Sequence, residues 1–180
     1  ALLYFNEDLV TDAGYVTNFV DPATQKSISK FQVGDLFFQW KNTAFSGWPI
    51  KINVYLYKNF GASSEMGAIL PVGDGGEELA YGRGTDNDTA WFGRIQVGDY
   101  KKPGQIALRF SRYDSKPDAI FFAYGQSDSR RSSNVDGYRT DFRIGLPKSS
   151  YINFTWYRTN WTLGDDTTMN RIFLDFIFPF

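Results

Sequence analysis

The chain contains no cysteine and no histidine among its 180 residues. Disulfides, thiolate nucleophiles and imidazole catalysis are therefore excluded, and neither a serine triad nor a cysteine–histidine pair can be built. An excess of one charge is also missing, because 19 Lys and Arg stand against 20 Asp and Glu. The resulting net charge of −1 argues against a general affinity for nucleic acid. No carboxylate pair or phosphate-binding glycine motif stands out, so the sequence predicts no enzyme, no cofactor and no metal site.

Long hydrophobic runs are missing as well. No stretch approaches the roughly 18 apolar residues that a membrane helix needs. Aromatic residues nevertheless make up 18% of the chain, while its mean hydropathy is −0.36. This combination is typical of a membrane β-barrel, in which half of each strand faces water. Because the chain begins at Ala1 and shows no signal sequence, we expect a mature form or a piece of a longer protein.

The last ten residues show the alternation of a strand most clearly. One set is apolar throughout: Ile172, Leu174, Phe176, Phe178 and Phe180. The residues between them include Arg171 and Asp175. A period of two predicts a strand with one fully apolar face, as expected where that face meets lipid.

The same alternation recurs along the chain. It predicts strands over 31–41, 50–59, 91–98, 105–112, 138–146, 151–159 and 171–180, and residues 2–5 are a candidate for an eighth. The predicted long connections are about 10–30, 60–88, 113–136 and 160–170, and the short ones are 42–48, 99–104 and 147–150. Long and short connections alternate, which places all long loops at one end of an up-and-down meander. The sequence therefore predicts a single all-β, antiparallel transmembrane β-barrel domain, or the C-terminal portion of one, with about 7–8 strands in this chain.

Three segments of the C-terminal half carry a sequence resemblance: GQIALRFSRYD at 104–114, DAIFFAYGQSDS at 118–129 and NVDGY at 134–138. In these segments the chain resembles a family of porins of the bacterial outer membrane. The resemblance implies a barrel of about sixteen strands, of which this chain is the C-terminal half, with its C-terminus in the periplasm. It also implies outer-membrane lipids as surroundings, and a homotrimer or a further barrel-completing segment as partner. Phe176, Phe178 and Phe180 resemble the C-terminal signal that the barrel-assembly machinery reads.

If the apolar sets face lipid, the alternate sets face the lumen. The predicted pore-lining residues are Lys51, Arg94, Arg109, Arg139, Asp141, Arg143 and Asp175, and Asp35 and Arg171 belong to the same sets. An excess of arginine on a water-filled wall predicts a passive channel for ions and small polar solutes with a weak preference for anions. Alternatively, Arg139, Asp141 and Arg143 pair across strands and only hold the wall together.

Two loops suggest further sites. The connection 113–136 is long enough to fold inward, and Asp128, Arg130 and Arg131 would then form a constriction; alternatively it is a solvated outer loop. The acidic stretches at 74–78 and 86–88 carry oxygen ligands that suit a hard cation, although a solvated surface explains them better.

Two other functions fit the same strands. One is a small eight-stranded outer-membrane barrel without a pore, serving adhesion or anchoring, because eight-stranded barrels fill their interior with side chains. The other is a secreted β-sandwich that binds carbohydrate through exposed Trp and Tyr.

Overall fold

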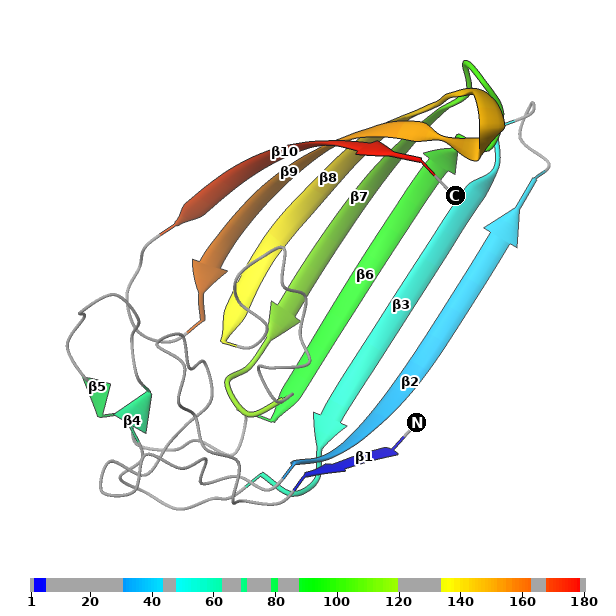
Figure 1. The fold of residues 1–180 in the computed structure, drawn as a ribbon. Helices are drawn as coiled ribbons and strands as arrows, with labels where there is room; N and C mark the ends of the chain where they lie inside the picture. Colours follow the sequence, from blue (N-terminus) through cyan, green and yellow to red (C-terminus); the bar gives the residue numbers. More distant parts are fainter. Residues whose placement is uncertain are drawn as a thin grey trace.

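The computed structural model describes residues 31–43, 48–62, 88–119, 134–162 and 168–178, and the backbone of 2–5, 69–70 and 79–80 (Figure 1). In these parts the chain forms one eight-stranded sheet in the order β1-β2-β3-β6-β7-β8-β9-β10. Its strands are β1 (Leu2–Phe5), β2 (Phe31–Asn42), β3 (Ile50–Asn59), β6 (Thr89–Gly98), β7 (Ile106–Ser115), β8 (Val135–Gly145), β9 (Tyr151–Trp161) and β10 (Met169–Ile177). A separate small hairpin pairs β4 (Ile69–Leu70) with β5 (Leu79–Ala80).

Each strand of the large sheet is antiparallel to its neighbours, and its spatial order follows its order in the chain. The short connections β2–β3, β6–β7 and β8–β9 lie together at one end of the sheet, and the last of them contains the 3₁₀ turn η3 (Pro147–Ser149) (Figure 1). The predicted all-β, antiparallel, up-and-down arrangement is confirmed. The sheet is open, with β1 and β10 at its two edges. Among the described residues, no helix has the length and apolar character to span a membrane.

The strands extend beyond the predicted ones at the long-loop end. Strand β7 continues to Ser115 and β8 begins at Val135, so the predicted boundaries of the 113–136 connection were wrong and it spans 116–134. The 160–170 connection likewise shortens to 162–168. The 60–88 connection contains the β4–β5 hairpin, which the sequence did not predict. Residues 10–30 lie outside the described residues.

The sheet curls, and its two faces differ in chemistry (Figure 1). Side chains on the convex face are large, apolar and exposed, as for Leu108 (51%), Phe110 (45%) and Leu174 (61%). Many side chains directed into the curl are polar, and several of these are buried, as for Ser111 (0%) and Asp141 (0%). Soluble proteins show the opposite distribution, with polar groups outside and large apolar groups inside.

Two glycines of β8 accommodate groups from β7 and its preceding turn. A Cβ at Gly145 would collide with the backbone carbonyls of Lys102 and Tyr100. The turn is instead hydrogen-bonded there, from Gly104 N to Gly145 O (2.9 Å) and from Gly145 N to Gln105 O (2.8 Å). These contacts fold the turn between β6 and β7 against the end of β8.

At the other glycine, Gly137, a Cβ would lie 2.8 Å from the hydroxyl oxygen of Tyr113. The Tyr113 side chain crosses this position and is hydrogen-bonded to Thr159 Oγ1 on β9 (2.7 Å). Strands β7, β8 and β9 are thereby tied together beyond their backbone ladders.

Candidate pore-lining face

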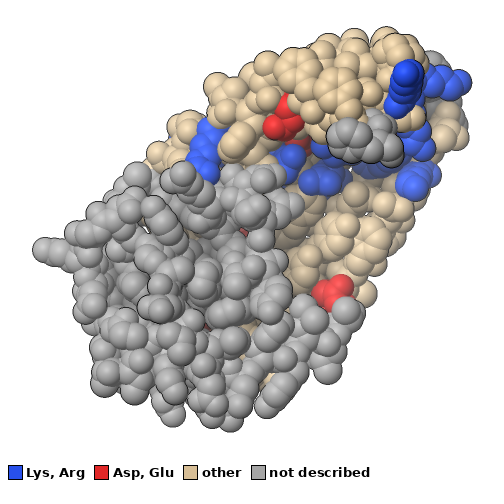
Figure 2. All heavy atoms as spheres, viewed as in Figure 1, with Lys and Arg blue, Asp and Glu red and all other residues tan. Residues whose placement is uncertain are grey.

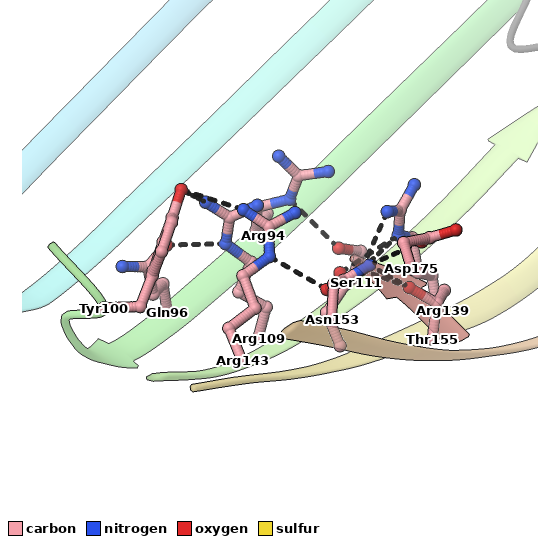
Figure 3. Close-up of polar contacts among 11 residues, drawn as sticks. Arg94, Gln96, Tyr100, Arg109, Ser111, Arg139, Arg143, Asn153, Thr155 and Asp175 are labelled. Atoms are coloured by element: carbon pink, nitrogen blue, oxygen red, sulfur yellow. Dashed lines mark hydrogen bonds and ion pairs between the residues drawn. The ribbon is translucent and has the colours of Figure 1, made fainter. Parts of the chain in front are cut away.

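Four arginines from three adjacent strands gather on the concave face (Figure 3). Arg94 comes from β6, Arg109 from β7, and Arg139 and Arg143 from β8. Strand register brings them together, because Ser111 stands opposite both Arg94 and Arg139, and Arg109 stands opposite Asp141. In the space-filling view, Lys and Arg side chains form a band across the upper part of the molecule (Figure 2). The predicted lumen-facing arginines therefore share one cluster.

Arg139 is neutralised by Asp141. Its Nη2 and Nε donate to Asp141 Oδ1 at 2.7 and 2.9 Å, and Nε also lies 3.0 Å from Oδ2. The buried Asp141 accepts a further hydrogen bond from Thr155 Oγ1 at 2.9 Å. The predicted pairing therefore occurs, but it runs along β8 rather than across strands.

The other three arginines are held by neutral groups. Arg94 Nε donates to Ser111 Oγ (3.2 Å), Arg109 Nε to Gln96 Oε1 (2.6 Å) and Arg143 Nε to Asn153 Oδ1 (2.9 Å). Among the described residues, none of the three forms an ion pair. Their positive charges are therefore oriented without being cancelled by a bonded carboxylate.

Tyr100, in the turn between β6 and β7, joins two of these arginines. Its hydroxyl oxygen accepts hydrogen bonds from Arg143 Nη1 (2.8 Å) and Arg109 Nη2 (3.3 Å). The same ring lies 4.9 Å from the Arg143 guanidinium carbon and 4.8 Å from the Tyr151 ring. Sequence reasoning missed Tyr100, because nothing in the alternation of a strand indicates where a turn residue points.

The remaining predicted pore-lining residues lie outside the arginine cluster or at its edge. Lys51, on β3, stands opposite Gln96 of β6 and is partly exposed. Asp175, on β10, is exposed and accepts a hydrogen bond from Asn153 Nδ2 at 3.1 Å.

The other predicted residues are described only in part. Phe176 and Phe178 are each 57% exposed, while Phe180 lies outside the described residues. Asp128, Arg130 and Arg131 also lie outside them, so the predicted constriction stays a prediction. In the acidic loop, Asp88 pairs with Lys58 at 2.6 Å. Within the part of the chain that the structure describes, no group of three or more acidic side chains has a geometry that would hold a metal ion.

On the long-loop side of the arginines, four aromatic residues stand opposite one another across four strands. The row is Phe37 (β2), Tyr55 (β3), Phe92 (β6) and Tyr113 (β7). The Phe37 and Tyr55 rings stack at 4.5 Å with 26° between their planes, and the Tyr55 and Phe92 rings meet edge to face at 5.8 Å. The concave face thus has an aromatic row beside a cationic cluster.

Comparison of the chain with protein-family models, with curated proteins and with solved structures found no match. The function has to be inferred from the two faces of the sheet and the groups that they carry.

Proposed function

We propose that the chain forms part of the wall of a bacterial outer-membrane porin, a passive water-filled channel for ions and small polar solutes. The observation that carries this proposal is the inverted polarity of the sheet. Large apolar side chains are exposed on the convex face, and polar side chains are buried on the concave face. A strand between lipid and a water-filled lumen needs this pattern, whereas one between water and a protein core needs its reverse.

The topology supports the same proposal. Neighbours in the sheet are neighbours in the chain, and the short connections share one end. In outer-membrane barrels the short turns are periplasmic and the long loops external. By this analogy β10 runs towards the periplasm, and the C-terminus lies on that side.

A channel requires the sheet to close. In hydrocarbon, each unpaired backbone group at a sheet edge costs several kcal/mol, so open edges are not stable there. We therefore propose that further strands pair with the β10 edge and the β1–β2 edge, either from a longer form of this protein or from another copy. A complete barrel of about sixteen strands, assembly into a trimer and recognition by the barrel-assembly machinery belong to this proposal.

Three arginines of the concave face favour anions. Within the described residues, Arg94, Arg109 and Arg143 each place a guanidinium there without a bonded carboxylate, whereas Arg139 and Asp141 cancel one another. Charges on a pore wall set its ion preference by raising the local concentration of ions of opposite sign. Anions should therefore pass more readily than cations of the same size.

Planar-bilayer recording of the detergent-purified, intact protein tests both parts of the proposal. We expect stepwise conductance and, in a KCl gradient, a reversal potential that reports preference for chloride. The triple substitution Arg94→Gln, Arg109→Gln, Arg143→Gln should lower the ratio of anion to cation permeability roughly fivefold. This change corresponds to about 1 kcal/mol, the interaction energy of one pair of unit charges 4 Å apart in water.

A matched control is Arg158→Gln, because Arg158 is exposed on the convex face of β9 and should leave the ratio unchanged. A protein that is monomeric and soluble without detergent, or that never conducts in bilayers, would contradict the channel. Conductance with equal permeability for both ions before and after the triple substitution would contradict only the anion preference.

A further inference from the structure

Passive conduction of small ions does not require the aromatic row on the concave face. Phe37, Tyr55, Phe92 and Tyr113 occupy positions directed into the curl, where the neighbouring rows carry polar and charged groups. Phe37 is 46% exposed, and Tyr55 and Phe92 are partly exposed. Ions in water gain little from such rings, so their grouping on this face calls for another explanation.

The aromatic row lies next to a cationic row. Residues two apart on a strand share a face and are separated by about 7 Å, which is the spacing between Phe92 and Arg94 on β6. The Arg94 guanidinium carbon lies 4.8 Å from the centre of the Phe92 ring, so the two groups are in contact. The Tyr55 ring contacts Phe92 from the other side at 5.8 Å.

The terminal nitrogens of Arg94 have no hydrogen-bond partner within the described residues. Only its Nε donates within the described residues, to Ser111 Oγ, and no carboxylate is bonded to its terminal nitrogens. Arg109 stands on the next strand with neutral partners as well. A planar guanidinium with free nitrogens is suited to bind a carboxylate through two parallel hydrogen bonds.

We propose that this part of the concave face binds carboxylates attached to a ring that has an apolar face. The ring would lie against Phe37, Tyr55 and Phe92, and the carboxylate would be bound by Arg94. This inference rests on the proposed function in that it names the class of solute that the channel favours.

The combination of groups selects this class over simpler ones. An inorganic anion would use the arginines but gain nothing from the rings, and a neutral ring would leave the guanidinium without a partner. A ring substituted with a carboxylate uses both rows, because its charge projects a few ångströms beyond the ring, comparable to the 4.8 Å between the Arg94 guanidinium carbon and the centre of the Phe92 ring. Aromatic acids and sugar acids share this chemistry, since the apolar face of either ring can lie against an aromatic side chain.

Isothermal calorimetry with the intact protein in detergent tests binding independently of conduction. Benzoate represents the aromatic acids and trigalacturonate the sugar acids, and acetate, benzyl alcohol and galactose provide the controls. We expect at least one ring-bearing carboxylate to bind tenfold or more tightly than acetate and than its neutral counterpart. Binding of benzoate would identify aromatic acids as the ligand class, and binding of trigalacturonate would identify sugar acids.

Substitutions then separate the two rows. Phe37→Leu together with Tyr55→Leu should weaken binding of the ring-bearing acid about tenfold, since two aromatic contacts to its ring are lost. Arg94→Gln should weaken the same acid and leave the neutral ring unaffected. The matched control is Phe38→Leu, the neighbour of Phe37 that points to the convex face and is 58% exposed.

Phe37→Leu alone serves as a second variant if the double substitution fails to assemble, because Phe37 lies on a partly exposed strand near the sheet edge. Binding of acetate as tight as that of benzoate and trigalacturonate would overturn the inference, as would binding that the Phe37 and Tyr55 substitutions leave unchanged. Conductance without binding of any ring-bearing acid would contradict the proposed site but not the proposed channel. Binding without conductance would contradict the proposed channel but not the site.

Discussion

The convex and concave faces of the sheet are built from alternate residues of the same strands, yet large apolar side chains predominate on one face and hydrogen-bonded polar groups on the other. On β7, Leu108 and Phe110 point outward and are half exposed, while the alternate residues Arg109 and Ser111 join a hydrogen-bonded network. Neighbouring backbone positions thus belong to two environments. Because successive side chains of a strand alternate, one strand can separate an apolar medium from a polar one with no second layer of protein.

The two faces also differ in how they are held. On the convex face, neighbouring strands are linked mainly by van der Waals contacts between apolar side chains. On the concave face, side-chain hydrogen bonds link residues of β6 to β10. Equivalent substitutions on the two faces should therefore have unequal effects.

The largest difference is expected for the two aspartates of β8. Asp141 is fully buried on the concave face and pairs with Arg139, so Asp141→Asn leaves a largely buried guanidinium without this carboxylate. We expect a loss of about 3 kcal/mol in the free energy of unfolding, measured by urea denaturation in lipid vesicles. The control is Asp136→Asn, because Asp136 pairs with Arg112 on the convex face in a more exposed setting and should cost less than about 1 kcal/mol. Equal losses would contradict the assignment of a special role to the concave pair.

The next largest effect concerns the medium outside the sheet. Phe110→Arg places a charge in the apolar set of β7 and should cost about 2–4 kcal/mol if that face meets lipid. The same denaturation measurement applies. Gln39→Arg, an exposed position on the concave side of β2, is the matched control and should change stability little. A neutral or stabilising effect of Phe110→Arg would mean that the convex face meets water.

The smallest effect is expected for single hydroxyl groups. Tyr113→Phe removes the 2.7 Å hydrogen bond to buried Thr159 and should cost about 1 kcal/mol. Tyr138→Phe, on the convex face of β8, should stay within about 0.5 kcal/mol. Thermal or urea unfolding of the two variants side by side measures the difference. A larger loss of stability for Tyr138→Phe than for Tyr113→Phe would contradict a structural role for the hydrogen bonds of the concave face.

Much of the fold follows from the alternation alone. The seven long strands from residue 31 onward correspond to the predicted ones, because each has an apolar set long enough to detect. The prediction fails at the long-loop ends, where the outward positions become Arg112, Asp114 and Asp136. The sheet continues there although its outward residues are no longer apolar. Hydrophobic periodicity therefore detects only the apolar part of each strand and not its full length.

Hydrophobic alternation also predicts part of the candidate site. Alternation assigns Arg94, Arg109, Arg139 and Arg143 to the inner face, but it does not tell which residue stands beside which. The choice of Gln96 and Asn153 as partners, instead of carboxylates, depends on the register between strands.

The two glycines of β8 have a consequence for the width of a closed barrel. A pattern with a period of two is unchanged when one strand slides past another by two residues, so polarity alone permits several staggers. A slide of β8 by two residues would bring Arg139 or Val135 to the place of Gly137 beneath the Tyr113 ring, and the turn before β7 would lose its fit to Gly145. The total stagger, or shear, fixes the diameter of a barrel together with its strand number. Two residues without side chains would thus help to set how wide the channel is.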